Sequence, residues 1–147
     1  MMFIKQLSII IENKRGALSG LATLMEKNDM DLIAFTLVDT GETGILRAVV
    51  NDPDTALELL RKTHYPVTIT DVFAIPLMDN PGALAQVLEL LRSNNICVEY
   101  LYSFLRQIEG DGVVVLRTNL PGAACELFKA NHIPMISEAE LAAKKAK

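Results

Sequence analysis

The sequence contains one turn-and-helix pattern twice, in ENKRGALSGLATLMEKNDMDLIAFTLV near its start and in MDNPGALAQVLELLRSNNICVEYLYSF near its middle. Aligning Gly16 with Gly82 gives an offset of 66 residues (82 − 16) that also pairs the apolar helix positions. After the next turn the offset becomes 68 (132 − 64), and it pairs Pro53 with Pro121, Glu58 with Glu126, His64 with His132, and Pro66 with Pro134. Internal duplication explains both offsets, so the fold must be one that about 70 residues can build and then repeat.

The size and composition indicate a soluble globular protein. The chain has 147 residues, of which 50% are hydrophobic, with a formal net charge of −4 and a pI of about 5.2. A repeat of this size is close to the lower limit for an independent core. We therefore expect the two repeats to pack closely on each other or on a second chain.

Strand and helix periodicities alternate within each half. The first half predicts, in order, a strand in FIKQLSIIIE, a helix from Arg15 to Asn28, strands in LIAFTLVD and GILRAVV, a helix starting at Asp52-Pro53, and a strand in PVTIT. The second half repeats this order, with its hairpin strands in YLYSFLRQ and VVVLRT. The order βαββαβ, twice, predicts an α+β fold of two tandem ferredoxin-like sandwiches, with antiparallel sheets and helices on one face.

The repeat also predicts the domain boundaries. We expect a first domain over residues 1–71 and a second over 72–147, with no flexible linker between them. Ser137 and Glu140 have the spacing of a capping box, which predicts a short terminal helix before a solvated basic tail.

Several classes of function are disfavoured by composition and motifs. The acidic balance and the absence of Trp argue against nucleic acid as a partner. Cys97 and Cys125 are the only cysteines and form no Cys-x-x-Cys pair, which predicts a reducing cytoplasm and neither a metal site nor another cofactor. No apolar run approaches 18 residues, so no membrane span is expected, and the start has no export signal.

The duplicated turn is the candidate binding element. Gly16 and Gly82 would let the backbone amides at a helix N-terminus approach a carboxylate. The alternative is that Asn13, Asp79 and Asn80 only cap helices while glycine and proline shape the turn. The sequence of one turn does not decide between the two.

The segment MDNPGALAQVLELLRSNNICV resembles the Asp-x-Pro-Gly-x-Leu, helix, Asn-Ile-x signature of ACT domains, the small-molecule sensors attached to many enzymes of amino-acid metabolism. The resemblance covers both halves and is clearer in the second, because the first half has Arg15 in place of the usual proline. The chain therefore resembles a stand-alone tandem ACT protein.

The resemblance implies an amino-acid ligand at an interface between two ACT units. One unit would contribute its first turn and the other the entry to its second strand. In this sequence, the implied turn positions are Asn13, Lys14, Gly16, Ala17, Asp79, Asn80, Gly82 and Ala83, and the strand-entry positions are Asp31 and Cys97. Asp31 could accept a hydrogen bond from the ligand ammonium group, whereas Cys97 could do so only poorly.

The sequence thus predicts a regulatory protein that binds a free amino acid or a related small carboxylate and forms a homodimer. Its target would be an enzyme or regulator of amino-acid metabolism. The main alternative is a structural dimerisation module without a ligand. An enzyme is disfavoured, because no nucleophile is paired with a base in the sequence.

Overall fold

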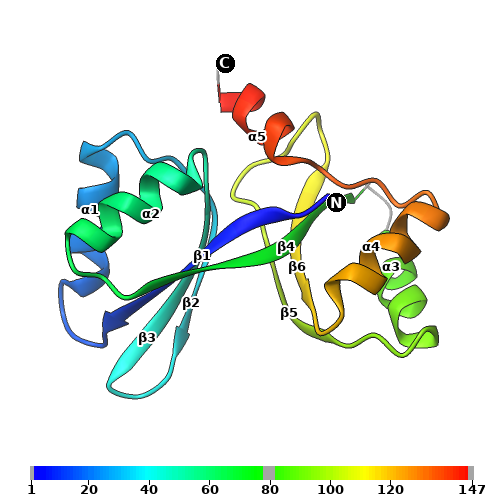
Figure 1. Cartoon of the computed structure of the whole chain (residues 1–147), viewed down its shortest axis with the longest axis horizontal. Coiled ribbons are helices and arrows are strands. Elements are labelled where there is room, and N and C mark those ends of the chain that lie inside the picture. Colours follow the sequence, from blue (N-terminus) through cyan, green and yellow to red (C-terminus); the bar gives the residue numbers. More distant parts are fainter. Residues whose placement is uncertain (1, 78–81, 146–147) are drawn as a thin grey trace. The chain divides into compact units, whose positions relative to one another are not determined.

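The computed structural model describes residues 2–77 and 82–145, with side chains up to residue 141 (Figure 1). The chain forms two compact units, Lys5–Thr70 and a second that combines Met1–Ile4 with Asp71–Lys147. Strands β1 (Ile4–Glu12) and β4 (Val67–Leu77) each contribute residues to both units. The division at residue 71 that we predicted for the domains stays a prediction.

The first unit is a sheet with strand order β2-β3-β1-β4. Its other elements are α1 (Ala17–Lys27), β2 (Leu32–Asp39), β3 (Thr43–Val50) and α2 (Pro53–Lys62). Alternate residues of β1, namely Leu7, Ile9 and Ile11, are buried together with apolar residues of both helices. This period-two pattern places α1 and α2 on one face of the sheet.

The second unit has strand order β4-β6-β5. It contains α3 (Gly82–Ser93), β5 (Val98–Ser103), β6 (Gly112–Thr118), α4 (Pro121–Ala130) and α5 (Glu138–Lys145). Phe73 lies at the centre of its core, with ring centroids 5.2 Å from Phe3 and 5.1 Å from Phe128. The predicted tandem ferredoxin-like fold class is confirmed.

The end of the second repeat departs from the predicted order. A closing strand is expected there, but residues 133–137 form coil in which the Ile136 N–H donates to the Ala74 carbonyl at 2.8 Å. The capping box is the cause: the Ser137 hydroxyl accepts from the Glu140 N–H at 3.2 Å and starts α5 where the first repeat continues as strand. The predicted terminal helix is confirmed.

All four helices of the duplicated pattern end in the same way. A side chain directly after the helix donates to the carbonyl four residues earlier: Asn28 to Leu24, Thr63 to Leu59, Asn94 to Leu90, and Asn131 to Leu127. The next residue takes a left-handed backbone conformation, with positive φ at Asp29, His64, Asn95 and His132. These are Schellman ends, and they explain why the two histidines recur in the repeat: each occupies the left-handed position.

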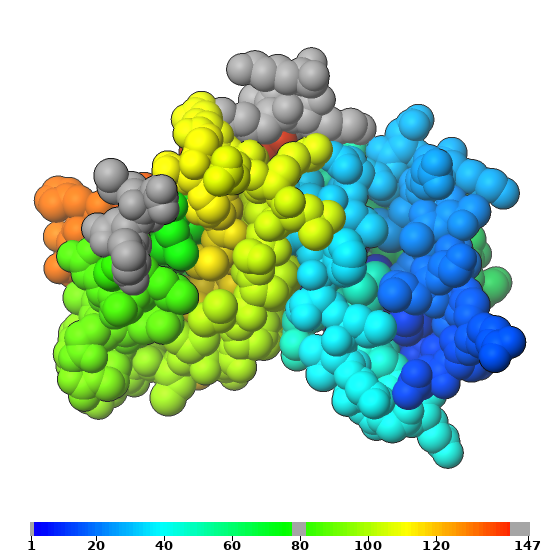
Figure 2. Space-filling model, turned by 180° about the vertical axis from the view of Figure 1, so that it is seen from behind, coloured from blue at the N-terminus to red at the C-terminus, as the bar shows by residue number. Residues whose placement is uncertain are grey.

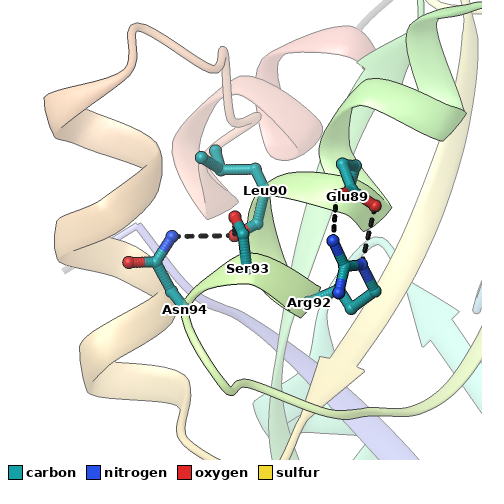
Figure 3. A network of polar contacts seen from close by, with 5 residues as sticks. All are labelled: Glu89, Leu90, Arg92, Ser93 and Asn94. Atoms are coloured by element: carbon teal, nitrogen blue, oxygen red, sulfur yellow. Dashed lines mark hydrogen bonds and ion pairs between the residues drawn. The ribbon is translucent and has the colours of Figure 1, made fainter.

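The end of α3 illustrates this arrangement (Figure 3). The Asn94 amide donates to the Leu90 carbonyl at 2.9 Å, and Ser93 donates to the same oxygen at 3.1 Å. In the same last turn, Arg92 forms an ion pair with Glu89 and lowers the pKa of that carboxyl. The last turn is therefore held by side chains of its own helix and C-cap.

Thr118 is a buried polar residue that destabilises the second unit. It is fully buried, and its hydroxyl has no hydrogen-bond partner among the described residues. Its counterpart in the first repeat is Val50, which is equally buried. Burial of an unpaired hydroxyl is unfavourable, so this position of the second repeat is less stable than that of the first.

We therefore expect Thr118→Val to raise the free energy of unfolding by about 1 kcal/mol, because it removes the unpaired hydroxyl and keeps the side-chain shape. Urea denaturation measures the change. Val50→Thr is the matched control and should destabilise the protein by a similar amount. Equal stability of Thr118→Val and the parent protein would contradict this account.

Candidate functional site

A pocket lies at one end of the first unit, on the sheet face that α1 and α2 cover. Cross-strand pairing sets Ile11 of β1 opposite Gly44 of β3, and Gly44 opposite Asp39 of β2. The row behind it pairs Leu46 with both Ile9 and Leu37. Because residues two apart share a face, both rows lie on the face beneath the helices, with Gly44 in the middle of the outer row.

The pocket has a volume of about 160 Å³. It is lined by Ile11, Glu12, Asn13, Lys14, Leu18, Leu37, Asp39 and Gly44. Four of these form apolar or side-chain-free walls, and the other four carry polar or charged groups. A ligand here would meet aliphatic carbon on one side and charge on the other.

Asn13 joins the β1–α1 turn to the β2–β3 hairpin, which lie side by side in blue and cyan in Figure 2. Its side-chain amide donates to the Gly41 carbonyl at 2.7 Å and to the Asp39 carboxylate at 3.2 Å. Its backbone N–H donates to the Glu42 carbonyl at 2.9 Å. Asn13 therefore fixes the rim of the pocket, and the alternative in which it caps the following helix is wrong.

Gly16 has a specific role in the turn. It precedes α1 with φ 86°, and it leaves the N-terminus of that helix without a side-chain cap. A side chain at this position would meet no atom within 4 Å, so the left-handed conformation, not lack of space, is the reason for glycine here.

Charges of both signs lie at the rim of the pocket. The Lys14 ammonium is 2.8 Å from a Glu12 carboxylate oxygen. This hydrogen bond raises the pKa of Lys14 above its ordinary value, and the side chain is positively charged at neutral pH with or without it. The Asp39 carboxylate also accepts from the Gly41 N–H at 2.8 Å, which orients it at the end of β2.

The two predicted strand-entry residues take part in a repeated backbone clamp. The Asp31 N–H donates to the Asn51 side chain at 2.7 Å, and the Cys97 N–H donates to the Asn119 side chain at 2.9 Å. In return, Asn51 and Asn119 donate their own N–H groups to the carbonyls of Asp31 and Cys97, at 3.3 and 3.1 Å. Neither Asp31 nor Cys97 lines the pocket, and their binding roles stay predictions.

Of the predicted turn residues, the structure brings Asn13 and Lys14 to the pocket. Gly16 and Ala17 stand at the start of α1 but do not line it. Gly82 and Ala83 begin α3, and Asp79 and Asn80 lie outside the described residues. The pocket therefore belongs to the first repeat.

Six pocket residues were not predicted from the sequence, namely Ile11, Glu12, Leu18, Leu37, Asp39 and Gly44. One signal pointed to them: a glycine inside a strand often marks the close approach of a ligand or of other backbone. Gly44 is such a glycine, and Gly112 is its counterpart in the repeat.

Two further findings concern the described part of the chain as a whole. It holds no group of three or more His, Cys, Asp or Glu side chains arranged to bind a metal ion. No helix among the described residues has both the length and the hydrophobicity needed to cross a bilayer.

Comparison with known proteins identifies relatives of the whole chain. The sequence pattern of the ACT domain pair matches residues 2–145. Protein BT0572 from Bacteroides thetaiotaomicron is 35% identical, with a TM-score of 0.88 and 96% of each chain covered. No curated protein matches the sequence.

The regulatory subunit of aspartate kinase from Thermus thermophilus, in its ligand-free form, is 12% identical, with a TM-score of 0.59. The match covers 88% of this chain and 93% of that subunit. The corresponding subunit from Thermus flavus is 13% identical, with a TM-score of 0.57. The match again covers 88% of this chain and 93% of that subunit. At these identities the likeness concerns the fold alone.

We expect Asn13→Ala to lower the free energy of unfolding by about 1 kcal/mol, since two side-chain hydrogen bonds between the turn and the hairpin are lost. Hydrogen exchange at the Gly41 amide should accelerate, because that amide is held by the same Asp39 carboxylate. Arg15→Ala, in the same exposed turn, is the control and should change stability by less than about 0.5 kcal/mol. Unchanged exchange at Gly41 in Asn13→Ala would contradict the role given to Asn13.

Proposed function

The chain belongs to the family of ACT domain pairs, and on that premise we propose that it is a regulatory protein that binds a free amino acid in the pocket of its first unit. The observation that carries the proposal is the presence of Lys14 and Asp39 on the rim of one pocket with apolar walls. An amino acid has the complementary groups, because its carboxylate and ammonium are joined through one carbon atom that also bears the side chain.

The two charged ends of the ligand have distinct partners in this proposal. The ligand carboxylate binds the Lys14 ammonium, which exchanges its exposed contact with Glu12 for the ligand. The ligand ammonium donates to the Asp39 carboxylate, which Asn13 and the Gly41 amide already hold in place. Charge-assisted hydrogen bonds of this kind are about twice as strong as neutral ones.

Asp31 and Cys97 fit this proposal as residues that a second ACT unit would present. The turn of one unit and the strand entry of another would then share the ligand, as the family resemblance implies. The repeat-related turn with Asp79, Asn80, Gly82 and Ala83 would supply a second such site. A cytoplasmic location and a partner enzyme or regulator of amino-acid metabolism belong to the same proposal.

We also propose that the chain is a homodimer. β2 is the edge strand of the first unit and carries Phe35, which is large, apolar and exposed. An edge strand with apolar side chains is a surface that a second chain can cover. Light scattering at micromolar concentration should give twice the mass of one chain, and a monomer would overturn this part of the proposal.

The binding proposal predicts that at least one free amino acid raises the melting temperature. At a hundredfold excess over Kd, binding to the native state alone stabilises it by about 2.7 kcal/mol, which corresponds to a shift of several degrees. Lys14→Ala should weaken binding about tenfold or more, because it removes a charged partner of the carboxylate. Lys62→Ala, on the exposed side of α2, is the matched control and should bind as the parent does.

Asp39→Asn tests the other end of the ligand. It keeps an oxygen for the Gly41 amide but loses the negative charge that would face the ammonium. We expect weaker binding of the amino acid and little change for the corresponding acid without the amino group. If no amino acid binds the parent protein, as measured by calorimetry, the proposal falls.

A further inference from the structure

Gly44 is the residue that keeps the pocket open. It is buried within β3, between Ile11 on one neighbouring strand and Asp39 on the other. Its φ does not lie in the left-handed region, which among the glycines of the described residues is reserved for Gly16, Gly41 and Gly110. Backbone conformation therefore gives no reason for glycine, although glycine weakens a strand.

The reason for glycine at this position is space. A Cβ atom on Gly44 would lie 3.2 Å from Leu37 Cδ1, 3.3 Å from the Val38 carbonyl oxygen and 3.9 Å from Ile11 Cγ1. It would therefore project into the volume that the apolar walls enclose. Any larger side chain would fill the floor of the pocket.

Two walls of the pocket are leucines that are partly exposed. Leu18 of α1 is 39% exposed and Leu37 of β2 is 47% exposed, and both line the pocket. Water contact with these side chains is unfavourable, so a ligand that covers them with its own apolar carbons gains affinity. A charged ligand side chain that reaches the aliphatic walls would lose hydration there, which is unfavourable.

The volume limits the ligand as well. About 160 Å³ is close to the roughly 150 Å³ of an apolar cavity that encloses one benzene molecule, and here it must also hold the backbone of the amino acid. The charged groups of Glu12, Lys14 and Asp39 occupy the rim, so only the apolar part is left for the ligand side chain. That part suits a branched aliphatic group better than an aromatic ring.

We propose that the pocket selects an amino acid with a branched aliphatic side chain (valine, leucine or isoleucine), and that Gly44, Leu18 and Leu37 set this preference. The inference rests on the proposed function and adds to it the chemical class of the ligand. Gly44 limits the depth of the pocket, and the two leucines cover the branched end of the side chain.

Calorimetric titration of the full chain with single amino acids tests the inference. Valine, leucine and isoleucine should bind at least about tenfold more tightly than alanine, serine, aspartate, lysine or phenylalanine, because each methyl group in an apolar pocket contributes about tenfold or more. A tighter complex with a polar, charged or aromatic amino acid overturns this inference and leaves the proposed function standing. Absence of binding by every amino acid overturns the proposed function itself.

Two variants with opposite effects test the role of the walls. Gly44→Ala shortens the pocket and should weaken leucine binding about tenfold while alanine binding stays within about twofold. Leu37→Ala widens the pocket and should weaken valine binding about tenfold while it improves phenylalanine relative to valine. Because the contacts of a new Cβ at position 44 could disturb folding, Leu37→Ala tests the same assignment without adding an atom.

Gly112→Ala is the matched control for Gly44→Ala. Gly112 is the counterpart of Gly44 in the repeat, and a Cβ there would meet no atom within 4 Å. The first-unit site of Gly112→Ala should keep the affinities of the parent protein. If Gly112→Ala changes the preference and a folded Gly44→Ala does not, the selective pocket is not the one in the first unit, and the inference is overturned.

Discussion

The packing of α1 and α2 onto alternate side chains of β1 is the interaction on which the rest of the first unit depends. Leu7, Ile9 and Ile11 are buried on that face together with Leu21 and other residues of the helices. A shift of one residue in β1 would turn all three toward the opposite face, so the core fixes the register of the strand. Every cross-strand neighbour then follows from that register, including the alignment of the pocket-forming row.

The pocket exists because large side chains fill the helix-covered face of the sheet only up to the row before the outermost one. Behind it, Leu46 fills the space between Ile9 and Leu37. In the outer row a glycine stands at the corresponding place in β3, and the helix above it has only just begun. The same layer that is packed with side chains in the middle of the sheet is therefore hollow at its end, next to turns that carry charge.

The two repeats share several backbone interactions and differ at one buried position and at the final segment. Both preserve the left-handed helix ends and the asparagine clamps Asn51 and Asn119. They differ at Val50 and Thr118, and at the final segment, where the capping box of Ser137 replaces a strand with a helix. The repeats therefore share backbone interactions within each βαββα segment and differ at the chain end.

The sequence by itself determined the repeat, the fold class, the order of the elements up to the last strand, and the start of α2 at Asp52, whose carboxylate accepts from the Thr55 N–H at 3.2 Å. These features depend on periodicity and on residues within a few positions of one another, which can be read along the chain. The family resemblance also pointed to Asn13 and Lys14, and both line the pocket.

Only the tertiary structure decided that Asp39, Gly44 and Leu37 belong to the same site as that turn. These residues are 24 to 31 positions from Asn13 in the sequence (37 − 13 and 44 − 13), and antiparallel register brings them into two neighbouring rows. It also decided that Asn13 binds the hairpin and not its own helix. The physical reason is that a residue's cross-strand neighbours depend on how the whole sheet buries its apolar face, a choice that no local segment makes alone.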